Sequence, residues 1–257
     1  MSLDPHVEWD GIWLQMAVGM SKNPGRKYRN QIILSEISKI PGTNLRLLDF
    51  GCGTGDLLNI LQKKFPKIEY TGLDISSEAL NKARNKLPTV KFIQLDKDSN
   101  SLKLKSKVTP QSVVIISEVL EHLSEPDEAL ELIRSLLTQE PLQDCTLLVT
   151  VPAGPMSYFD KFIGHKTHYS DKTITKLLNH NGFQVEKIYK AGFPGINFLR
   201  IATIVRGKSI LNDVKVGDKQ SLFVKIVLKV IELLFTISKK NSRFGWQIVV
   251  IARHQLK

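Results

Sequence analysis

Hydrophobic and polar positions divide the chain into two kinds of segment. Short apolar runs rich in β-branched residues predict buried strands, and runs with apolar residues every three or four positions predict amphipathic helices. Because helical patterns separate most of the strand-like runs, their order predicts βαβ units and a mainly parallel sheet. The strand-like runs are residues 45–50, 68–74, 90–96, 113–117, 146–151, 183–189 and 246–252.

Helical patterns flank this alternating region on both sides. Arg26 to Lys39 reads as a helix that Pro41-Gly42 closes. Residues 191–245 break the alternation, with one helix expected over Phe193–Val205 and a stronger one over Ser221–Ser238. We therefore expect four parts, which are a helical cap (1–44), a core (45–190), a helical insertion (191–245) and the last strand of the core (246–257).

The predicted helix Ser221–Ser238 has one narrow polar stripe formed by Lys225, Lys229, Glu232 and Thr236. Charges in its middle argue against a spanning helix and favour one that lies flat on an apolar surface. That surface is either the rest of the protein, a second subunit or a membrane. Residues 191–257 contain 12 Lys and Arg against 3 Asp and Glu, and the whole chain has a net charge of +11. This charge favours contact with anionic lipid, nucleic acid or an acidic substrate.

The central stretch of the chain is a glycine-rich turn between a strand and a helix. Gly51, Gly53 and Gly55 follow the first strand, and residues without Cβ atoms let a ligand lie against bare backbone. The spacing Gly-x-Gly-x-Gly does not meet the dinucleotide fingerprint Gly-x-Gly-x-x-Gly. Asp49, at the last turn of the strand, would repel a pyrophosphate and would attract a ligand that carries an ammonium group.

Further acids follow the next two strands. Asp74 ends the second strand, where a carboxylate of a doubly wound sheet faces the ribose hydroxyls of a bound nucleoside. Ile75 follows it and can lie on an adenine face. Asp96 ends the third strand.

The glycine turn with Asp49 resembles the first motif of the class I S-adenosylmethionine (SAM) methyltransferases. The resemblance covers roughly residues 26–190. It implies an α/β fold with a Rossmann-like seven-stranded sheet, helices on both faces and an N-terminal helical cap. The C-terminal helical insertion departs from the family pattern, in which the last strand returns antiparallel beside the sixth. The resemblance also implies that the core binds SAM, with Asp74 at the ribose and Asp96 near the adenine amino group. The expected cofactor-binding residues are Asp49, Gly51, Gly53, Gly55, Asp74, Ile75, Asp96, Ser117 and Glu118.

Acids and imidazoles follow the fourth and fifth strands, which also end at the ligand crevice. If Glu118 starts a helical turn, Glu121 and His122 converge with it on one point. His165 and His168 lie in another loop at the same edge. Such a set suits either a divalent cation or a histidine base that takes a proton from the acceptor. His122 is the first candidate base, followed by His165 and His168.

This constellation resembles two methyltransferase groups, the ubiquinone-biosynthesis O-methyltransferases and the small-RNA 3′-terminal 2′-O-methyltransferases. In the second group a Glu, Glu, His, His set holds a divalent metal, which implies Glu118, Glu121, His122 and His168 here, with His165 as the other choice for the fourth ligand. The cation, Mg or Zn, is an alternative to histidine acting alone.

We therefore expect a SAM-dependent methyltransferase acting on a small-molecule acceptor, with a hydroxyl, lipid-linked or aromatic acceptor first. The alternatives are an RNA 2′-O-methyltransferase with a divalent metal and a non-catalytic SAM-binding scaffold. Two cysteines in apolar strand contexts, Cys52 and Cys145, favour a reducing compartment over a disulfide framework. We expect a cytoplasmic monomer or homodimer with peripheral membrane contact, and nucleic acid is the less favoured partner.

Overall fold

The computed structural model describes residues 10–11, 23–42, 44–95, 104, 107–137, 145–209 and 222–254, and only the backbone of residues 222–228. Asp96 and the Lys225 side chain, both expected to have roles, lie outside the described residues. The elements used below are α2 (Pro24–Ile37), β1 (Arg46–Phe50), α3 (Asp56–Lys64), β2 (Glu69–Asp74), α4 (Ser77–Lys86), β3 (Lys91–Gln94), β4 (Val113–Ser117), η1 (Leu120–His122), α6 (Pro126–Leu136), β5 (Thr146–Pro152), α7 (Tyr158–Phe162), α8 (Asp171–His180), β6 (Phe183–Ala191), α9 (Gly195–Arg206), η2 (Gly207–Ser209), α11 (Leu222–Thr236) and β7 (Gln247–His254).

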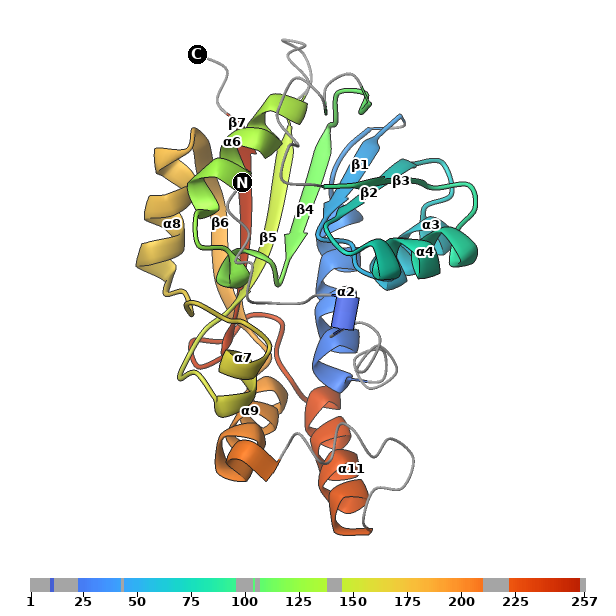
Figure 1. Ribbon diagram of the computed structural model, residues 1–257. Coiled ribbons are helices and arrows are strands. Elements are labelled where there is room, and N and C mark those ends of the chain that lie inside the picture. Colours follow the sequence, from blue (N-terminus) through green and yellow to red (C-terminus); the bar gives the residue numbers. More distant parts are fainter. Residues whose placement is uncertain are drawn as a thin grey trace.

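These strands form a seven-stranded sheet in the order β3-β2-β1-β4-β5-β7-β6. Strands β1 to β5 are parallel, and β7 runs antiparallel between β5 and β6. The predicted Rossmann-like sheet with helices on both faces is confirmed (Figure 1). The strand order changes direction between β1 and β4, and the carboxyl ends of the strands at such a switch point are where open α/β sheets bind their ligands.

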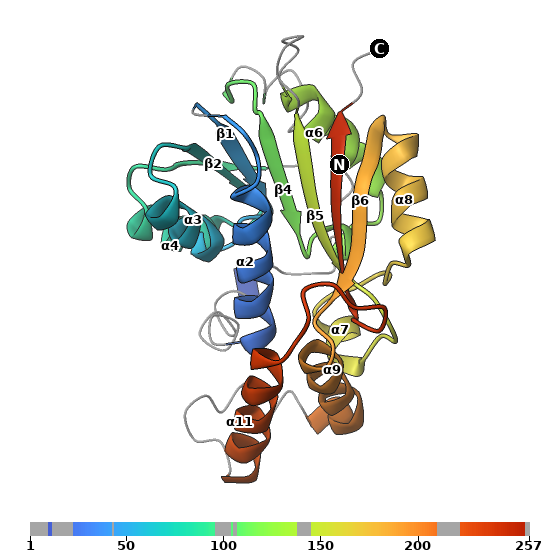
Figure 2. The same ribbon diagram turned by 180° about the vertical axis from the view of Figure 1, so that it is seen from behind.

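Two hydrophobic layers cover the sheet, one on each face. On one face α6 and α8 bury residues such as Leu130, Ile133 and Ile174 against β4, β5 and β7. On the other face, seen in Figure 2, α2, α3 and α4 pack on β1, β2 and β4. Helix α2 buries Ile32 and Ile33, at 1% and 0% exposed, so this predicted cap helix is part of the core layer.

Side-chain caps explain where several helices begin. The Ser76 hydroxyl accepts a hydrogen bond from the backbone of Ala79 and caps α4, and Ser170 caps α8 in the same way. The short helix α7 is not foreseen by the sequence pattern. It begins with a capping box in which Ser157 and Asp160 bond each other's backbone N–H groups.

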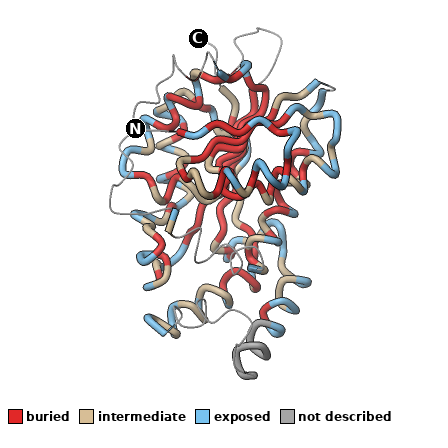
Figure 3. The backbone as a smooth tube through the Cα atoms, turned by 45° about the vertical axis from the view of Figure 1, so that its right-hand side comes forward, coloured by how far each residue is buried: buried red, intermediate tan, exposed pale blue. Residues whose placement is uncertain are grey.

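Helices α7, α9 and α11 extend the molecule beyond the carboxyl ends of the parallel strands (Figures 1 and 2). Helix α9 begins at Gly195, two residues after the start predicted from the sequence, and α11 has 15 described residues, fewer than the span Ser221–Ser238 predicted from the sequence. No helix among the described residues is long and apolar enough to cross a membrane. Figure 3 shows that buried positions concentrate in the sheet, whereas this helical lobe is mostly half-buried or exposed.

Candidate active site

The glycine turn after β1 is held against the neighbouring strand by its backbone. The N–H groups of Gly51 and Cys52 both donate to the carbonyl oxygen of Leu73, at 2.8 and 2.9 Å. Gly51 has φ +79°, and a Cβ atom there would lie 2.4 Å from Cγ2 of Val119. A side chain at this position is therefore excluded both by the backbone conformation and by the loop after β4.

Two acidic side chains lie buried beside this turn, one on each of the adjacent strands β1 and β2. Asp49 is 2% exposed and Asp74 is 7% exposed. Burial, and next the charge of Asp74, raise the pKa of Asp49 from 3.8 to about 7, against the opposing charge of Arg26. Burial also raises the pKa of Asp74. Two neighbouring buried carboxyls disfavour each other's ionised form, and a cationic ligand relieves that cost, so the pair fits the ammonium end of SAM.

The carboxylate of Asp74 also orders the backbone around it. Its Oδ2 accepts from Gly53 N at 2.7 Å and its Oδ1 accepts from Ser76 N at 2.9 Å. Each carboxylate oxygen has a second lone pair, so the group retains acceptors for two hydroxyls of a ribose. Ile75 is half-buried against the core, at the start of the loop to α4.

The loop after β4 places Glu118 differently from the helical turn considered from the sequence. Glu118 has φ +56°, in the left-handed region that non-glycine residues rarely adopt. Its Oε1 accepts from Nε2 of Gln247 at 2.8 Å, and its Oε2 lies 3.5 Å from a guanidinium nitrogen of Arg29. The hydroxyl of Ser117, just before it, lies 2.9 Å from that of Thr150. Glu118 therefore faces α2 and β7 rather than stacking on a helical turn.

Glu121 lies in the short helix η1 and is fully buried, at 0% exposed. Both of its carboxylate oxygens are buried without a hydrogen-bond partner among the described residues. Burial, and next the charge of Glu118, raise the pKa of Glu121 well above its usual value. Ionising a buried carboxyl without hydrogen-bond partners is costly, and a cation beside it would offset that cost.

Three histidines cluster beside Glu121. The rings of His122 and His165 meet edge to face with centroids 4.5 Å apart. Nδ1 of His165 lies 3.1 Å from Nε2 of His168. Burial lowers the pKa of His122 from 6.5 to about 4 and that of His165 to about 2, and it also lowers the pKa of His168. All three imidazoles are therefore neutral at pH 7.

Hydrogen bonds assign the tautomers of the two loop histidines. Nδ1 of His168 lies 2.9 Å from the carbonyl oxygen of Gly154, and because a carbonyl only accepts, this nitrogen carries the proton. Nε2 of neutral His168 is then an acceptor, so Nδ1 of His165 donates to it. Nε2 of His165 is left as the lone-pair nitrogen of the pair.

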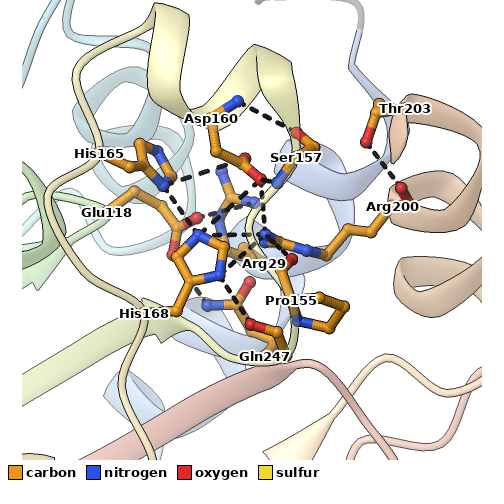
Figure 4. A network of polar contacts seen from close by, with 11 residues as sticks. Arg29, Glu118, Pro155, Ser157, Asp160, His165, His168, Arg200, Thr203 and Gln247 are labelled. Carbon is orange, nitrogen blue, oxygen red and sulfur yellow. Dashed lines mark hydrogen bonds and ion pairs between the residues drawn. The ribbon is translucent and has the colours of Figure 1, made fainter. Parts of the chain in front are cut away.

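Arg200 and Asp160 hold this histidine pair from the side of the helical lobe (Figure 4). A guanidinium nitrogen of Arg200, on α9, donates to Oδ2 of Asp160 at 2.9 Å and lies 3.2 Å from Nε2 of His168. Asp160 in turn bonds the backbone of Ser157. The lobe and the core therefore share one polar network.

The predicted metal ligands divide between different surroundings. Glu118 pairs with Arg29 and Gln247, whereas Glu121, His122 and His165 have ligand atoms within 4.8 Å of one another. A second group with this spacing joins His165 and His168 to Asp160. The Arg200 cation beside Asp160 makes the second group the poorer site for a metal. The ligand set with the better geometry therefore contains His165 where the sequence favours His168.

Several residues of this network are not identified from the sequence. Arg29, Asp160, Arg200 and Gln247 come from four separate elements, and only the spacing Ser157-x-x-Asp160 is a readable local signal, for a helix start. Asp10 is a fifth case. It accepts hydrogen bonds from the Ser76 and Ser77 hydroxyls at the start of α4, next to Asp74.

Comparison with known proteins places this geometry in a family. A family profile described as a methyltransferase domain matches residues 25–188. A trans-aconitate 2-methyltransferase of Paracidovorax citrulli (strain AAC00-1) is 40% identical over 50 residues, which are 20% of this chain and 19% of that protein. A malonyl-(acyl-carrier protein) O-methyltransferase of Halalkalibacterium halodurans is 29% identical over 117 residues, which are 44% of this chain and 41% of that protein. The chain thus spans less than half of the length of these curated relatives.

A solved structure resembles the chain over almost its whole length. It comes from a complex between the Haloferax volcanii Trm112 methyltransferase activator and a protein assigned as a methyltransferase, and its TM-score is 0.61 at 14% identity. The match covers 98% of this chain and 99% of that one. At this identity the likeness concerns the fold alone.

Proposed function

The chain belongs to the family of methyltransferase domains and is a SAM-dependent methyltransferase, and we propose that it transfers the methyl group to an oxygen atom of a small-molecule acceptor. SAM supplies a methyl group made electrophilic by a sulfonium. The observation that carries the proposal is the neutral histidine pair at the crevice, with its lone-pair nitrogen on His165. An oxygen nucleophile needs its proton removed as the methyl group is transferred, and this nitrogen can take it.

In the proposed cofactor site, Asp49 faces the ammonium group and Asp74 faces the ribose hydroxyls of SAM. The glycine turn lets the cofactor approach the backbone, and Ile75 lies against the adenine. Ser117 and Glu118 flank the cofactor at the end of β4. The buried carboxyl pair supports this arrangement, because its electrostatic cost falls when a cation binds beside it.

The proposed base is His165, and His168 positions it. After His165 accepts a proton on Nε2, its Nδ1–H remains bonded to His168, whose own Nδ1–H remains bonded to the Gly154 carbonyl. Arg200 and Asp160 hold His168 in place. His122, which the sequence favours as the base, is packed edge to face against His165. Burial lowers its pKa less far than that of His165, to about 4 against about 2, so His122 stays the alternative base, and the choice of His165 rests on its hydrogen bond to His168.

Exposed aromatic side chains of α7 and the names of the relatives support the acceptor class. Tyr158 and Phe162 on α7, beside Asp160, are 39% and 45% exposed. These side chains suit an apolar or lipid-linked acceptor that carries one oxygen to the histidines. Two relatives are named for trans-aconitate and for a malonyl carrier protein, which are carboxylic acids, and these names favour a small-molecule acceptor over RNA. The scaffold alternative gives way to the family assignment.

A transfer assay with methyl-labelled SAM and cell extract, separated into lipid, small-molecule, RNA and protein pools, tests the acceptor class. We expect the label in the lipid or small-molecule pool. Label confined to RNA or protein would contradict the proposal.

The same assay tests the base. His165→Gln should lower the rate by roughly 10²- to 10⁴-fold with unchanged SAM affinity, as expected for the loss of a general base. His180→Gln, at an exposed histidine of α8, is the matched control. A wild-type rate in folded His165→Gln protein would show that His165 is not the general base. A methyl ester of a carboxylic acid as the product would show the same, because a carboxylate is already ionised at neutral pH and needs no base.

A divalent cation is a second proposal for the same cluster, and Glu121, His122 and His165 would hold it. The two Glu121 oxygens, buried without a hydrogen-bond partner among the described residues, favour it. Neutral imidazoles favour it too, because a metal binds the deprotonated form. The cation would supply a Lewis acid beside the acceptor oxygen.

Thermal unfolding in chelator, Zn²⁺ and Mg²⁺ tests the cation apart from activity. A cation at about 100 times its Kd stabilises the folded state by about 2.7 kcal/mol, which raises the Tm by roughly 5–10 °C in a protein of this size. The wild type should show this shift and Glu121→Gln should not. Full activity of the metal-free protein, with a Tm that Zn²⁺ and Mg²⁺ do not change, would reject the cation and retain the histidine base.

A further inference from the structure

The solvent-facing side of α9 is made of apolar residues. Phe198, Ile201, Ile204 and Val205 are exposed, by 51%, 43%, 36% and 79%. Their spacing of three and four residues puts them on one face of the helix. A surface helix of a globular protein normally turns its polar residues outward, so α9 has the reverse arrangement on its exposed face.

Helix α11 contacts α9 and carries a second apolar stripe on its exposed side. Val230 and Leu233, with Ile237 just beyond the helix end, are 53%, 66% and 64% exposed. Lys229 and Glu232 lie beside this stripe, as the predicted polar stripe requires. The opposite side of α11 is packed, with Ile231 4% exposed. Both helices extend past the sheet in Figures 1 and 2, so the two stripes belong to one protruding lobe.

Basic residues surround these stripes. Among the described residues 193–209 and 229–246, Glu232 is the one acid. Lys208 follows α9, and Lys239, Lys240 and Arg243 follow α11, all of them exposed. An exposed apolar surface bordered by lysine and arginine matches the interface of a bilayer with anionic headgroups, where apolar side chains enter the acyl boundary and cations meet the headgroups.

We propose that the apolar stripes of α9 and α11, with their basic border, form a surface that docks on an anionic lipid membrane. A second copy of the chain fits this surface less well, because a two-fold contact would bring the same basic borders together. The docking face also leads to the site. Arg200, one turn before Ile204 on α9, reaches Asp160 and His168, so docking would hold the histidine cluster one helix away from the lipid.

This inference rests on the proposed function only in making a lipid-linked acceptor accessible. Docking itself is measured without methyl transfer. The full-length protein is floated with vesicles of phosphatidylcholine alone and of phosphatidylcholine with phosphatidylserine. Salt of about 0.1 M and 1 M is compared, since the Debye length falls from about 10 Å to 3 Å between them.

The wild type should float with the anionic vesicles at low salt and much less at high salt. Lys239→Glu/Lys240→Glu should weaken binding on the order of 30-fold or more. Ile201→Gln/Val205→Gln should weaken it at both salt concentrations. Lys63→Glu/Lys67→Glu and Ile60→Gln, at exposed positions in and after α3, are the matched controls and should float as the wild type does.

Folded wild-type protein that stays at the bottom of every gradient would overturn the proposal. So would light scattering that shows a vesicle-free dimer abolished by Ile201→Gln/Val205→Gln, because a second copy would then cover the surface. The two failures are separable. Methyl transfer without flotation would support the activity and reject membrane docking. Flotation without methyl transfer to any pool would support docking and reject the proposed acceptor chemistry.

Discussion

The carboxyl of Asp49 should weaken the folded state of the SAM-free protein as the pH rises. Its pKa is about 7 in the fold against 3.8 for an ordinary aspartate. Because the pKa of Asp49 is higher in the folded state than in the unfolded state, its ionisation lowers the free energy of unfolding. This loss is absent below pH 3.8, grows between pH 3.8 and about 7, and is complete above that. The difference of about three pKa units between the folded and unfolded states limits this loss of unfolding free energy to about 4 kcal/mol.

Asp49→Asn removes this penalty and keeps the shape of the side chain. The buried amide adds a cost of its own, about 1–3 kcal/mol where its hydrogen bonds are incomplete. We therefore expect the variant to be about 2 kcal/mol less stable than the wild type at pH 4 and about 2 kcal/mol more stable at pH 8, measured by urea unfolding without SAM. Its affinity for SAM should fall by about tenfold to a hundredfold, because a charge-assisted contact is worth about 1.5–3 kcal/mol.

Glu69→Gln, at the exposed first position of β2, is the control and should show neither effect. A stability difference between Asp49→Asn and the wild type that is the same at pH 4 and pH 8 would refute the electrostatic account. Unchanged SAM affinity measured by calorimetry would remove Asp49 from the ammonium site. Weaker binding together with higher stability would identify Asp49 as a residue kept for the ligand at the expense of the fold.

Three further predictions concern the turn and the lobe. Asp74→Asn should weaken SAM binding by about tenfold to a hundredfold in calorimetry, and unchanged affinity in a folded variant would place the ribose elsewhere. Gly51→Ala should cost about 3 kcal/mol in chemical unfolding, because its Cβ would meet Val119 at 2.4 Å at a φ of +79°, and the added change Val119→Ala should recover only the steric part. Tyr28→Phe removes a 2.8 Å hydrogen bond to the carbonyl of Lys239 and should lower the unfolding free energy by about 1 kcal/mol with unchanged SAM affinity, whereas a large loss of affinity would make Tyr28 a cofactor contact.

Local patterns account for the parts of the fold that the sequence predicts. The apolar run of β4 and the glycines after β1 are each signals contained in a few neighbouring residues, so the strands and the turn could be predicted from the sequence. Strand ends differ from the predicted ones by up to a few residues, because pairing with a neighbouring strand decides where a strand stops. The role of each candidate site residue stays a prediction.

Long-range contacts explain what the sequence could not predict. Nothing in the local sequence indicates that Glu118 adopts a positive φ, because that conformation comes with its contacts to Arg29 on α2 and Gln247 on β7. Arg200 likewise reaches Asp160 from a helix 40 positions later in the chain. Such pairs depend on the tertiary arrangement and have no periodic signature.

The position of β7 has a consequence for synthesis on the ribosome. In the described sheet, β6 pairs with β7 and with no other strand, so it has no edge to join until residues 247–254 have emerged. Gln247, the first residue of β7, also bonds both Glu118 and the Val151 carbonyl. A nascent chain that has completed β1 to β5 and the glycine turn therefore still lacks the contact that holds Glu118. The ability to bind the cofactor should therefore appear late in synthesis and in one step, when β7 inserts between β5 and β6, which are synthesised before it.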